Sequence, residues 1–400
     1  MLLFKLHMNI LMILESEFPP DVRVEKEIRT LTQAGHKIYL IATSTKKKIP
    51  EEQSNGLDIH RMHKSKLMTK FSALALSFPF YFNFWKRHIE RFLSKHQIDV
   101  IHLHDLPLAS VVFKLGKKHG IPAVFDFHEN RPEIMKLYAH TNTTIGKLLI
   151  SYKKWENYQA KYSKLADRLI LVTPEAKIYY TKKYQVNAEK TFVVPNFADV
   201  EHLKSIQPEQ EIKNKYSKKF MLVYFGDTGL RRGTMTIVEA ANLLKDRSEV
   251  HFVIIGNSKQ QYLLSEKAKT YGLTNIEFTG FLNFKEIVSY ISASRAGLCP
   301  FLRNIHHDTT YANKLFQFLY FGKPVIASDC PAQKTIINES NAGLIHVADD
   351  HHDLAKKIIE LKDHTDYNQL SQNAKKAVLS KYNTLIGNES LIDLYNSIKK

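Results

Sequence analysis

Short runs of β-branched and aromatic residues alternate with amphipathic stretches along the chain, and this alternation restricts the fold more than any other feature. It is typical of parallel sheets in which a helix follows each strand and covers the sheet. In the first half we expect strands at 9–14, 37–42, 100–104, 122–127, 168–173 and 191–195. We expect a second series at 220–226, 250–256, 275–280, 296–301, 324–328 and 343–347. The sequence therefore predicts the α/β class.

A polar, charged segment at 198–219 separates the two series of strands, and we expect a linker there. The chain has 400 residues, which is too long for one ordinary hydrophobic core. We therefore predict two Rossmann-like domains of similar size, at 1–197 and 220–365, facing each other across a cleft. The remaining residues, 366–400, read as terminal helices that could cross back to the first domain.

The composition excludes several classes of protein. With 44% hydrophobic and 24% charged residues, the chain is globular and not disordered. No run reaches the roughly 18 apolar residues that a spanning helix needs. Lys5, His7 and Asn9 interrupt the apolar start and no small-residue cleavage site follows, so we expect a buried strand, with Met8 as an alternative start, and not a signal peptide. Two cysteines indicate a reducing compartment, and we expect a cytoplasmic protein.

Basic residues outnumber acidic ones, 57 to 40, which gives a formal charge of +17 and attracts polyanions. Two basic segments rich in aromatic residues, 64–95 and 136–168, suit a helix lying on anionic lipid. They suit equally a helix that packs on the core and exposes a basic face, and both interpretations stay open. No RNA- or DNA-binding motif accompanies the charge, so we expect no nucleic-acid partner.

Ligands of open parallel sheets bind beyond the carboxyl ends of the strands, so residues that directly follow strands are the candidates for a site. Asp21 and Arg23 follow the strand at 9–14 and begin a helix that we expect to end near Gly35. Asp21 suits a helix cap as well as a role on the acceptor side.

Two further strand ends carry a polar cluster. Its members are His104, Asp105, Asp126, His128 and Glu129. A histidine beside a carboxylate can act as a general base or polarise a hydroxyl group, and it can equally be a satisfied polar group that closes a strand. We favour a substrate-facing role for His128 over one for His104, and we expect His102 to point away from His104. The adjacent pairs at 306–307 and 351–352 do not suit a zinc site, and we expect no metal.

A glycine-rich turn, "GDTGLRRG" at 226–233, follows the first strand of the second domain. Gly229 supplies flexibility, and Arg231 and Arg232 lie just before a helix. Arginine at a helix start suits a diphosphate. The turn is not a P-loop, because no Gly-Lys-Ser/Thr follows.

A second helix start, with Asn313 and Lys314, follows the strand at 296–301. Two helix N-termini, each with a cation, can converge on one diphosphate. We therefore interpret Lys314 as a phosphate-binding lysine and not as an ordinary surface residue. The first domain lacks Gly-x-Gly-x-x-Gly, which disfavours a dinucleotide cofactor.

Six motifs resemble those of family 4 glycosyltransferases with the GT-B fold, over about residues 8–380: "FPPDVRVEKEIRTLTQAGHKIYLI", "DFHE", "VVPNF", "GLRRG", "FTGFL" and "NKLFQFLYFGKPVIASD". The resemblance implies that the second domain binds a nucleotide-diphospho-sugar and the first a glycan or lipid-linked acceptor. It implies transfer with retention of the anomeric configuration, without a metal or a bound cofactor. Similar members build bacterial surface polysaccharide or lipopolysaccharide, which implies a cytoplasmic enzyme able to contact the inner face of the membrane.

Individual residues acquire roles from the resemblance. Arg232 matches the cation on the diphosphate, and His128 matches the histidine near the donor sugar and the acceptor. Asn313 and Lys314 match the start of the donor-binding helix. The backbone of Phe281 and Leu282 matches the loop that meets the base.

The sequence departs from the family pattern at two glutamates, where it has Thr309 and Gln317. Gln317 can still hydrogen-bond a ribose hydroxyl. Thr309 supplies no negative charge, for which the adjacent Asp308 is a substitute. Asp227 stands where many relatives have arginine, and Arg231 or Lys314 can compensate. These losses leave open an alternative, a catalytically degenerate GT-B subunit that binds a glycan or a partner transferase.

Overall fold

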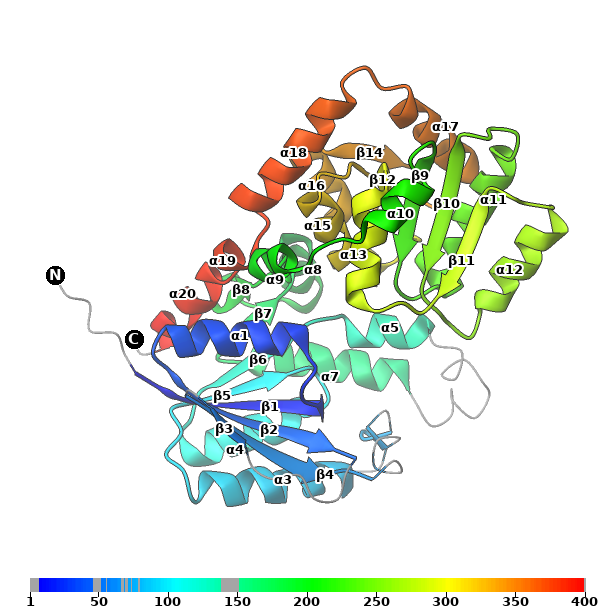
Figure 1. Ribbon diagram of the computed structural model, residues 1–400. Coiled ribbons are helices and arrows are strands. Elements are labelled where there is room, and N and C mark those ends of the chain that lie inside the picture. The colour runs from blue at the N-terminus through cyan, green and yellow to red at the C-terminus, as the bar shows by residue number, and fades with distance from the viewer. Residues whose placement is uncertain are drawn as a thin grey trace. The chain divides into compact units, whose positions relative to one another are not determined.

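The computed structural model describes residues 7–45, 52–54, 56–65, 68, 71–72, 74–77, 80–137 and 151–398 (Figure 1). The chain divides into two compact units, Met1–Pro195 with Asn388–Lys400, and Asn196–Gly387. Each unit contains a sheet covered by helices on both faces. The predicted α/β class with two parallel-sheet domains is confirmed.

The first unit has an eight-stranded sheet in the order β3-β4-β2-β1-β5-β6-β7-β8, parallel except between β3 and β4. Its strands are β1 (Asn9–Glu17), β2 (Lys37–Ser44), β3 (Glu52–Ser54), β4 (Leu57–His63), β5 (Val100–His104), β6 (Ala123–Phe127), β7 (Arg168–Leu171) and β8 (Thr191–Val193). The sequence did not predict β3 and β4. In β4 only Ile59 and Met62 are buried, so the strand lacks the apolar run that reveals the others.

Helices cover both faces of this sheet, since the central strands bury side chains on both sides. In β1, Leu11 belongs to one apolar cluster and Met12 to the cluster on the opposite face. The helices are α1 (Val22–Gln33), α3 (Phe80–Leu93), α4 (Ala109–His119), α5 (Arg131–Leu137), α7 (Tyr152–Leu165), α8 (Pro174–Tyr184), the 3₁₀ turn η2 (Ala188–Lys190) and α20 (Glu389–Ile398). Helices α1 and α20 share one cluster, and α3, α4, α7 and α8 share the other.

The described parts of the two basic segments pack against the core. Helix α3 buries Trp85 and Ile89 while Arg87 and Arg91 are exposed, and α7 buries Trp155. This arrangement favours the core-packing interpretation over a lipid-binding one for these helices. Other parts of 64–95 and 136–168 lie outside the described residues. In the part of the chain that the structure describes, no helix is long and apolar enough to cross a membrane.

The second unit has a six-stranded, parallel sheet in the order β11-β10-β9-β12-β13-β14. Its strands are β9 (Phe220–Phe225), β10 (Val250–Ile255), β11 (Ile276–Gly280), β12 (Ala296–Cys299), β13 (Val325–Ser328) and β14 (Gly343–His346). Its helices are α9 (Val200–Ser205), α10 (Gln210–Lys215), the 3₁₀ turn η3 (Leu230–Arg232), α11 (Thr234–Leu243), α12 (Gln261–Thr270), α13 (Phe284–Ala293), α14 (Ile305–Asp308), α15 (Asn313–Tyr320), α16 (Pro331–Ser340), α17 (His351–Lys362), α18 (Tyr367–Ser380) and α19 (Thr384–Gly387).

The strand order reverses once in each sheet, between β1 and β5 in the first and between β9 and β12 in the second. At such a point the loops after the two neighbouring strands run to opposite faces of the sheet. This leaves a crevice beyond the carboxyl ends of the strands in which a ligand can bind. Both reversals therefore mark places to look for a site.

The segment 198–219, expected as a linker, forms α9 and α10 and belongs to the second unit. Leu203 and Tyr216 are buried in the core of that unit. With Ala198, which is also buried there, these side chains are too few and too widely spaced to give a periodic signal in a polar segment. At the other end of the chain, α18 and α19 belong to the second unit, whereas α20 belongs to the first.

Candidate functional site

At the reversal point of the second sheet, two loops are in direct contact. The glycine-rich turn follows β9, and its Gly226 and Gly233 have φ angles of +117° and +73°. Glycine adopts such positive φ angles without strain. A Cβ atom on Gly233 would lie 1.7 Å from the carbonyl oxygen of Pro300, which follows β12. A side chain at Gly233 would therefore separate the turn from this loop.

This contact brings the predicted cations Arg232 and Lys314 together. The Nζ atom of Lys314 lies 3.5 Å from the ring centroid of Tyr224 and 3.5 Å from where a Cβ of Gly226 would be. The guanidinium of Arg232 lies 5.3 Å from the ring centroid of Phe301, and Lys314 Nζ lies 5.6 Å from the same centroid. Both cations thus face one aromatic ring from separate loops.

The surroundings of Arg232 and Lys314 disfavour the positive charge on neighbouring groups. Burial, together with the charge of Arg232, lowers the pKa of Lys314 to about 7. Burial and Arg232 also lower the pKa of His307 to about 4. Among the described residues, Lys314 has contacts with aromatic rings but no carboxylate within ion-pair distance. A bound anion relieves such a cluster, so the arrangement suits an anionic ligand.

Asp227 is the counter-charge of the two arginines. Its Oδ2 atom lies 2.8 Å from Nη2 of Arg231 and 3.6 Å from Nε of Arg232, and its Oδ1 accepts a hydrogen bond from the backbone of Gly229. Burial opposes ionisation of Asp227, but the hydrogen bond from the Gly229 backbone and the charges of both arginines outweigh burial and lower its pKa. This carboxylate therefore holds the turn and both guanidinium groups in place.

Thr309, at the position of one family glutamate, and the adjacent Asp308 have local partners. The hydroxyl of Thr309 donates to the carbonyl oxygen of Ile305 at 2.6 Å. Asp308 forms an ion pair with Arg303, with Nε and Oδ1 2.8 Å apart. Arg303 thus offsets the charge of Asp308, which was expected to replace the missing carboxylate.

The remaining predicted donor-side residues differ in exposure. Asn313 is exposed and Gln317 half-buried, at the start and in the middle of α15. Phe281 is 84% exposed, which is unusual for an aromatic side chain, while Leu282 packs against the core of the second unit. Phe281 thus presents its ring to solvent beyond the end of β11.

In the first unit, three predicted residues surround the fully buried carboxylate of Asp126. His128 donates from Nε2 to Oδ2 at 2.8 Å, and Arg23 donates from Nη2 to Oδ1 at 2.8 Å. Nδ1 of His104 lies 3.4 Å from Oδ2. The sequence treated Asp126 as one member of a cluster, and the structure makes it the centre.

This carboxylate decides the charge of His128. Burial lowers the pKa of His128, but the negative charge of Asp126 outweighs burial and raises it to about 9. Burial and His102 lower the pKa of His104 to about 3. At neutral pH His128 therefore carries both ring protons and is a hydrogen-bond donor, whereas His104 is neutral.

The expectation that His102 points away from His104 was wrong. Their rings stack with centroids 4.4 Å apart, because residues two apart in a strand share a face. Glu27 was missed altogether. It lies four residues after Arg23 on α1, with Oε1 3.1 Å from Nε of Arg23, and is 2% exposed. The (i, i+4) spacing of opposite charges on a predicted helix was the available signal.

The other acceptor-side residues lie at the same edge of the sheet. Asp21 caps α1 by accepting from the backbone of Val24, which is the structural role considered for it. Asp105 has a φ angle of +68°, which few residues other than glycine adopt, and its Oδ1 lies 3.9 Å from Nδ1 of His128. Glu129 is half-buried beside His128.

Glu27, His102, His104 and Asp126 offer donor atoms that lie within 4.8 Å of one another, which resembles a metal site. The guanidinium of Arg23, however, lies 3.1 Å from Glu27 and 2.8 Å from Asp126. Its positive charge already lies between these two carboxyl groups and would repel a metal ion, so we assign the cluster to a network of polar and charged groups around Arg23 and Asp126.

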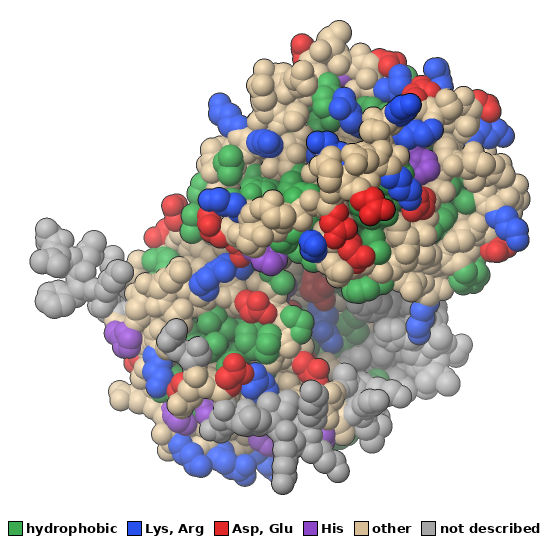
Figure 2. Space-filling view, in the orientation of Figure 1, with side chains coloured by type: hydrophobic (Ala, Val, Ile, Leu, Met, Phe, Trp, Pro, Cys, Tyr) green, Lys and Arg blue, Asp and Glu red, His purple; other side chains and the backbone are tan. Residues whose placement is uncertain are grey.

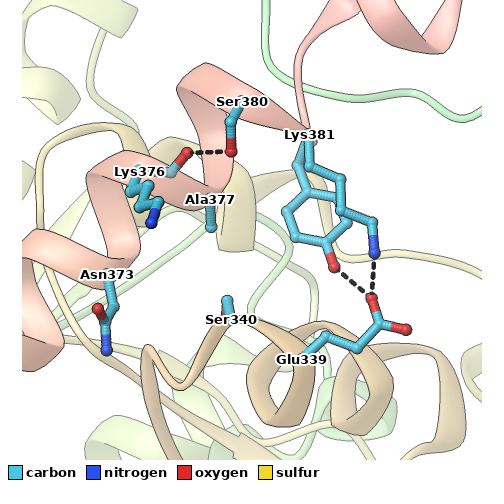
Figure 3. A pocket seen from close by; sticks show the side chains of 8 residues that line it. Glu339, Ser340, Asn373, Lys376, Ala377, Ser380 and Lys381 are labelled. Atoms are coloured by element: carbon cyan, nitrogen blue, oxygen red, sulfur yellow. Dashed lines mark hydrogen bonds and ion pairs between the residues drawn. The ribbon is translucent and has the colours of Figure 1, made fainter.

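A surface groove lies elsewhere in the second unit (Figure 3), where α16 and α18 approach each other. Both Lys381 Nζ and the Tyr382 hydroxyl donate to Oε2 of Glu339 at 2.6 Å. These bonds satisfy the charge of Glu339 and tie the two helices together. None of the residues predicted for the site lines this groove.

Comparisons with known proteins agree with this architecture. A family model described as glycosyltransferase family 4 matches residues 22–202, and one described as glycosyl transferases group 1 matches residues 205–377. An uncharacterized glycosyltransferase from Methanocaldococcus jannaschii is 22% identical over 251 residues, which are 62% of this chain and 59% of that protein.

Solved structures show the same fold. Sucrose-phosphate synthase from Thermosynechococcus elongatus superposes with a TM-score of 0.77 at 16% identity, over 98% of this chain and 99% of that chain. HepE from Anabaena, solved in complex with UDP-glucose, gives a TM-score of 0.68 at 14% identity, over 98% of this chain and 100% of that chain. The predicted GT-B fold is confirmed.

Proposed function

Because the chain belongs to the group 1, family 4 glycosyltransferases, we propose that it transfers a sugar from a nucleotide-diphospho-sugar to a glycan or lipid-linked acceptor. The observation that carries the donor class is the convergence of Arg232 and Lys314 on one aromatic ring at the reversal point of the second sheet. The complex of HepE with UDP-glucose supports a donor of this kind.

In this proposal the second unit stabilises the leaving group. Arg232, Lys314 and the backbone N–H groups of the turn neutralise the charge that develops on the departing nucleoside diphosphate. Protein cations then do the work that a metal does in other transferases, so we propose a metal-independent reaction. Phe281 and Leu282 lie beside the base, and Asn313 and Gln317 hydrogen-bond the sugar and the ribose.

The first unit binds the acceptor and positions it with Asp105, Glu129 and His128. Since His128 holds both ring protons at neutral pH, it acts as a hydrogen-bond donor to a sugar hydroxyl and not as a general base. We also propose transfer with retention, in which the acceptor hydroxyl attacks from the face that the diphosphate leaves. Catalysis then rests mainly on positioning and charge stabilisation.

We place the reaction in the synthesis of surface polysaccharide or lipopolysaccharide, on the cytoplasmic side of the membrane. The formal charge of +17 supports peripheral contact with anionic lipid. On the face shown in Figure 2, however, basic side chains lie interspersed with acidic ones. Such a surface favours weak contact over firm anchoring.

The alternative function is a degenerate subunit that binds a glycan or a partner transferase. It is supported by the bonds that Thr309 forms with Ile305 and Asp308 with Arg303, because both side chains are already paired within the unit. A thermal-shift screen with UDP-, GDP- and TDP-sugars tests donor binding, since a ligand of the native state raises Tm by mass action. Hydrolysis or transfer from the stabilising donor, with and without membrane extract, then tests activity. Donor binding without turnover in either condition would favour the degenerate subunit.

A further inference from the structure

Glu27 is a buried carboxylate that the proposed reaction does not use. It is 2% exposed, and neither of its oxygens accepts a hydrogen bond among the described residues. The nearest side-chain nitrogens of basic residues are Nε of Arg23 at 3.1 Å and Nε2 of His102 at 3.7 Å. An acid without hydrogen bonds in such a place is poorly stabilised as an anion.

The charges around Glu27 link it to His128. Arg23 bridges Glu27 and Asp126, and Asp126 in turn accepts from His128. The charges of Arg23 and Asp126 cancel, so Glu27 and His128 are the groups that decide the net charge of the buried cluster. Burial raises the pKa of Glu27 to about 8, to which Asp126 adds, while Arg23 and His128 oppose the shift.

Helix α20 completes the surroundings of Glu27. The hydroxyl of Tyr395 lies 2.8 Å from Nδ1 of His102, and burial keeps this hydroxyl protonated by raising its pKa. Burial also lowers the pKa of His102, which is therefore neutral. Nε2 of the same ring lies 3.7 Å from Oε2 of Glu27, beyond hydrogen-bond distance. Helix α20, far along the sequence, therefore holds the imidazole that lies beside Glu27.

We propose that Glu27 is a positioning residue that sets the charge of His128: when Glu27 gives up its buried proton, its negative charge, relayed by Arg23 and Asp126, holds the second proton on His128. This inference rests on the proposed role of His128 in transfer. The charged or titratable groups around Glu27 are Arg23 on α1, His102 and His104 on β5, Asp126 on β6, His128 after β6 and Tyr395 on α20. Those facing His128 are Asp126, His104, Asp105 and Arg23.

The test is a pH titration of His128 by NMR in the full chain with ¹³C-labelled histidine, its signal assigned by loss in His128→Asn. In the wild type we expect a midpoint near 9. In Glu27→Gln no anion forms, so the midpoint falls by about one pH unit. Glu25→Gln, an exposed carboxylate on the same helix, is the matched control and leaves the midpoint unchanged.

An unchanged midpoint in folded Glu27→Gln overturns the proposal. If that variant does not fold, the wild type decides, because ¹³C-labelled glutamate shows whether one carboxyl titrates near pH 8 in step with His128. Absence of such a carboxyl overturns the proposal. The NMR readout needs no substrate, so it stands apart from the proposed function. In Glu27→Gln, the fall of kcat/KM at high pH should shift together with the midpoint of His128. If the midpoint shifts and the fall of kcat/KM does not, His128 is coupled to Glu27 but takes no part in the reaction.

Discussion

The ammonium group of Lys314 lies against aromatic rings, so its charge depends on what binds beside it. Its pKa of about 7 means that about half of the free protein carries this charge at neutral pH. The neighbouring Arg232 is charged at every pH of interest. The two cations of the site therefore differ: the charge of Arg232 is constant, whereas the protonation of Lys314 depends on the bound ligand.

Replacing Arg232 with alanine should weaken donor binding and slow turnover together. Loss of a charge-assisted hydrogen bond is worth about 1.5–3 kcal/mol, so we expect kcat/KM for the nucleotide sugar to fall roughly 10- to 150-fold. Steady-state kinetics measure this change. Arg247→Ala, an exposed arginine of the same unit, should leave both constants unaltered. Wild-type turnover in Arg232→Ala would count against the diphosphate site.

Binding of a nucleoside diphosphate should take up protons above pH 7. The folded-state pKa of Lys314 is lowered, so the free lysine loses its proton as pH rises through about 7, and a bound anion restores it. Affinity should therefore decline from pH 7 upward. Isothermal titration in buffers of different ionisation enthalpy measures the uptake, and Lys314→Arg should abolish it. Identical proton uptake in that variant would contradict the assignment.

At the scale of elements, the site depends on how closely the turn after β9 meets the loop after β12. The alternating pattern predicted parallel sheets, and the two helix starts that carry cations predicted the meeting of Arg232 and Lys314, but the order of the strands was not predicted. The strand β4 was not predicted either, because its few buried residues leave no pattern. Glu27 and Asp126 gain importance only when α1, β5 and β6 pack together, and such tertiary contact has no local signature.

The close approach of these loops gives a test with glycine. In Gly233→Ala the added Cβ would lie 1.7 Å from a backbone oxygen at a φ angle of +73°, so the turn must move. We expect a loss of about 2–4 kcal/mol in unfolding free energy together with loss of donor binding. Gly272→Ala has a similar φ angle, +65°, but nothing within 4 Å, and should cost only about 1 kcal/mol. Equal effects in denaturant unfolding would show that the contact is unimportant.

At the scale of the whole molecule, the chain returns to its first unit after completing the second. Residues 388–400 belong with residues 1–195, and Leu391, Leu394 and Tyr395 of α20 join the cluster beneath α1. The hydroxyl of Tyr395 also reaches the histidines around Asp126. Helix α20 is therefore part of the unit to which we assign acceptor binding.

Leu394→Ala should accordingly destabilise the first unit, although the residue is only a few positions from the end of the described chain. Leu394 is fully buried, and truncation of a buried leucine costs about 2–5 kcal/mol. Leu385→Ala, a few residues earlier, removes a side chain that is 76% exposed and should change stability by less than about 0.5 kcal/mol. Hydrogen exchange of β1 and β5 amides reports the effect, and equal protection in both variants would refute it.

This return makes the second unit an insertion, entered after Pro195 and left before Asn388. During synthesis, the inserted unit has all of its residues before the first unit receives α20. The first unit therefore waits on the ribosome with part of one sheet face uncovered, since α1 alone covers that face until α20 has been made. A pause or premature stop before residue 389 would therefore damage the unit whose strands are translated first.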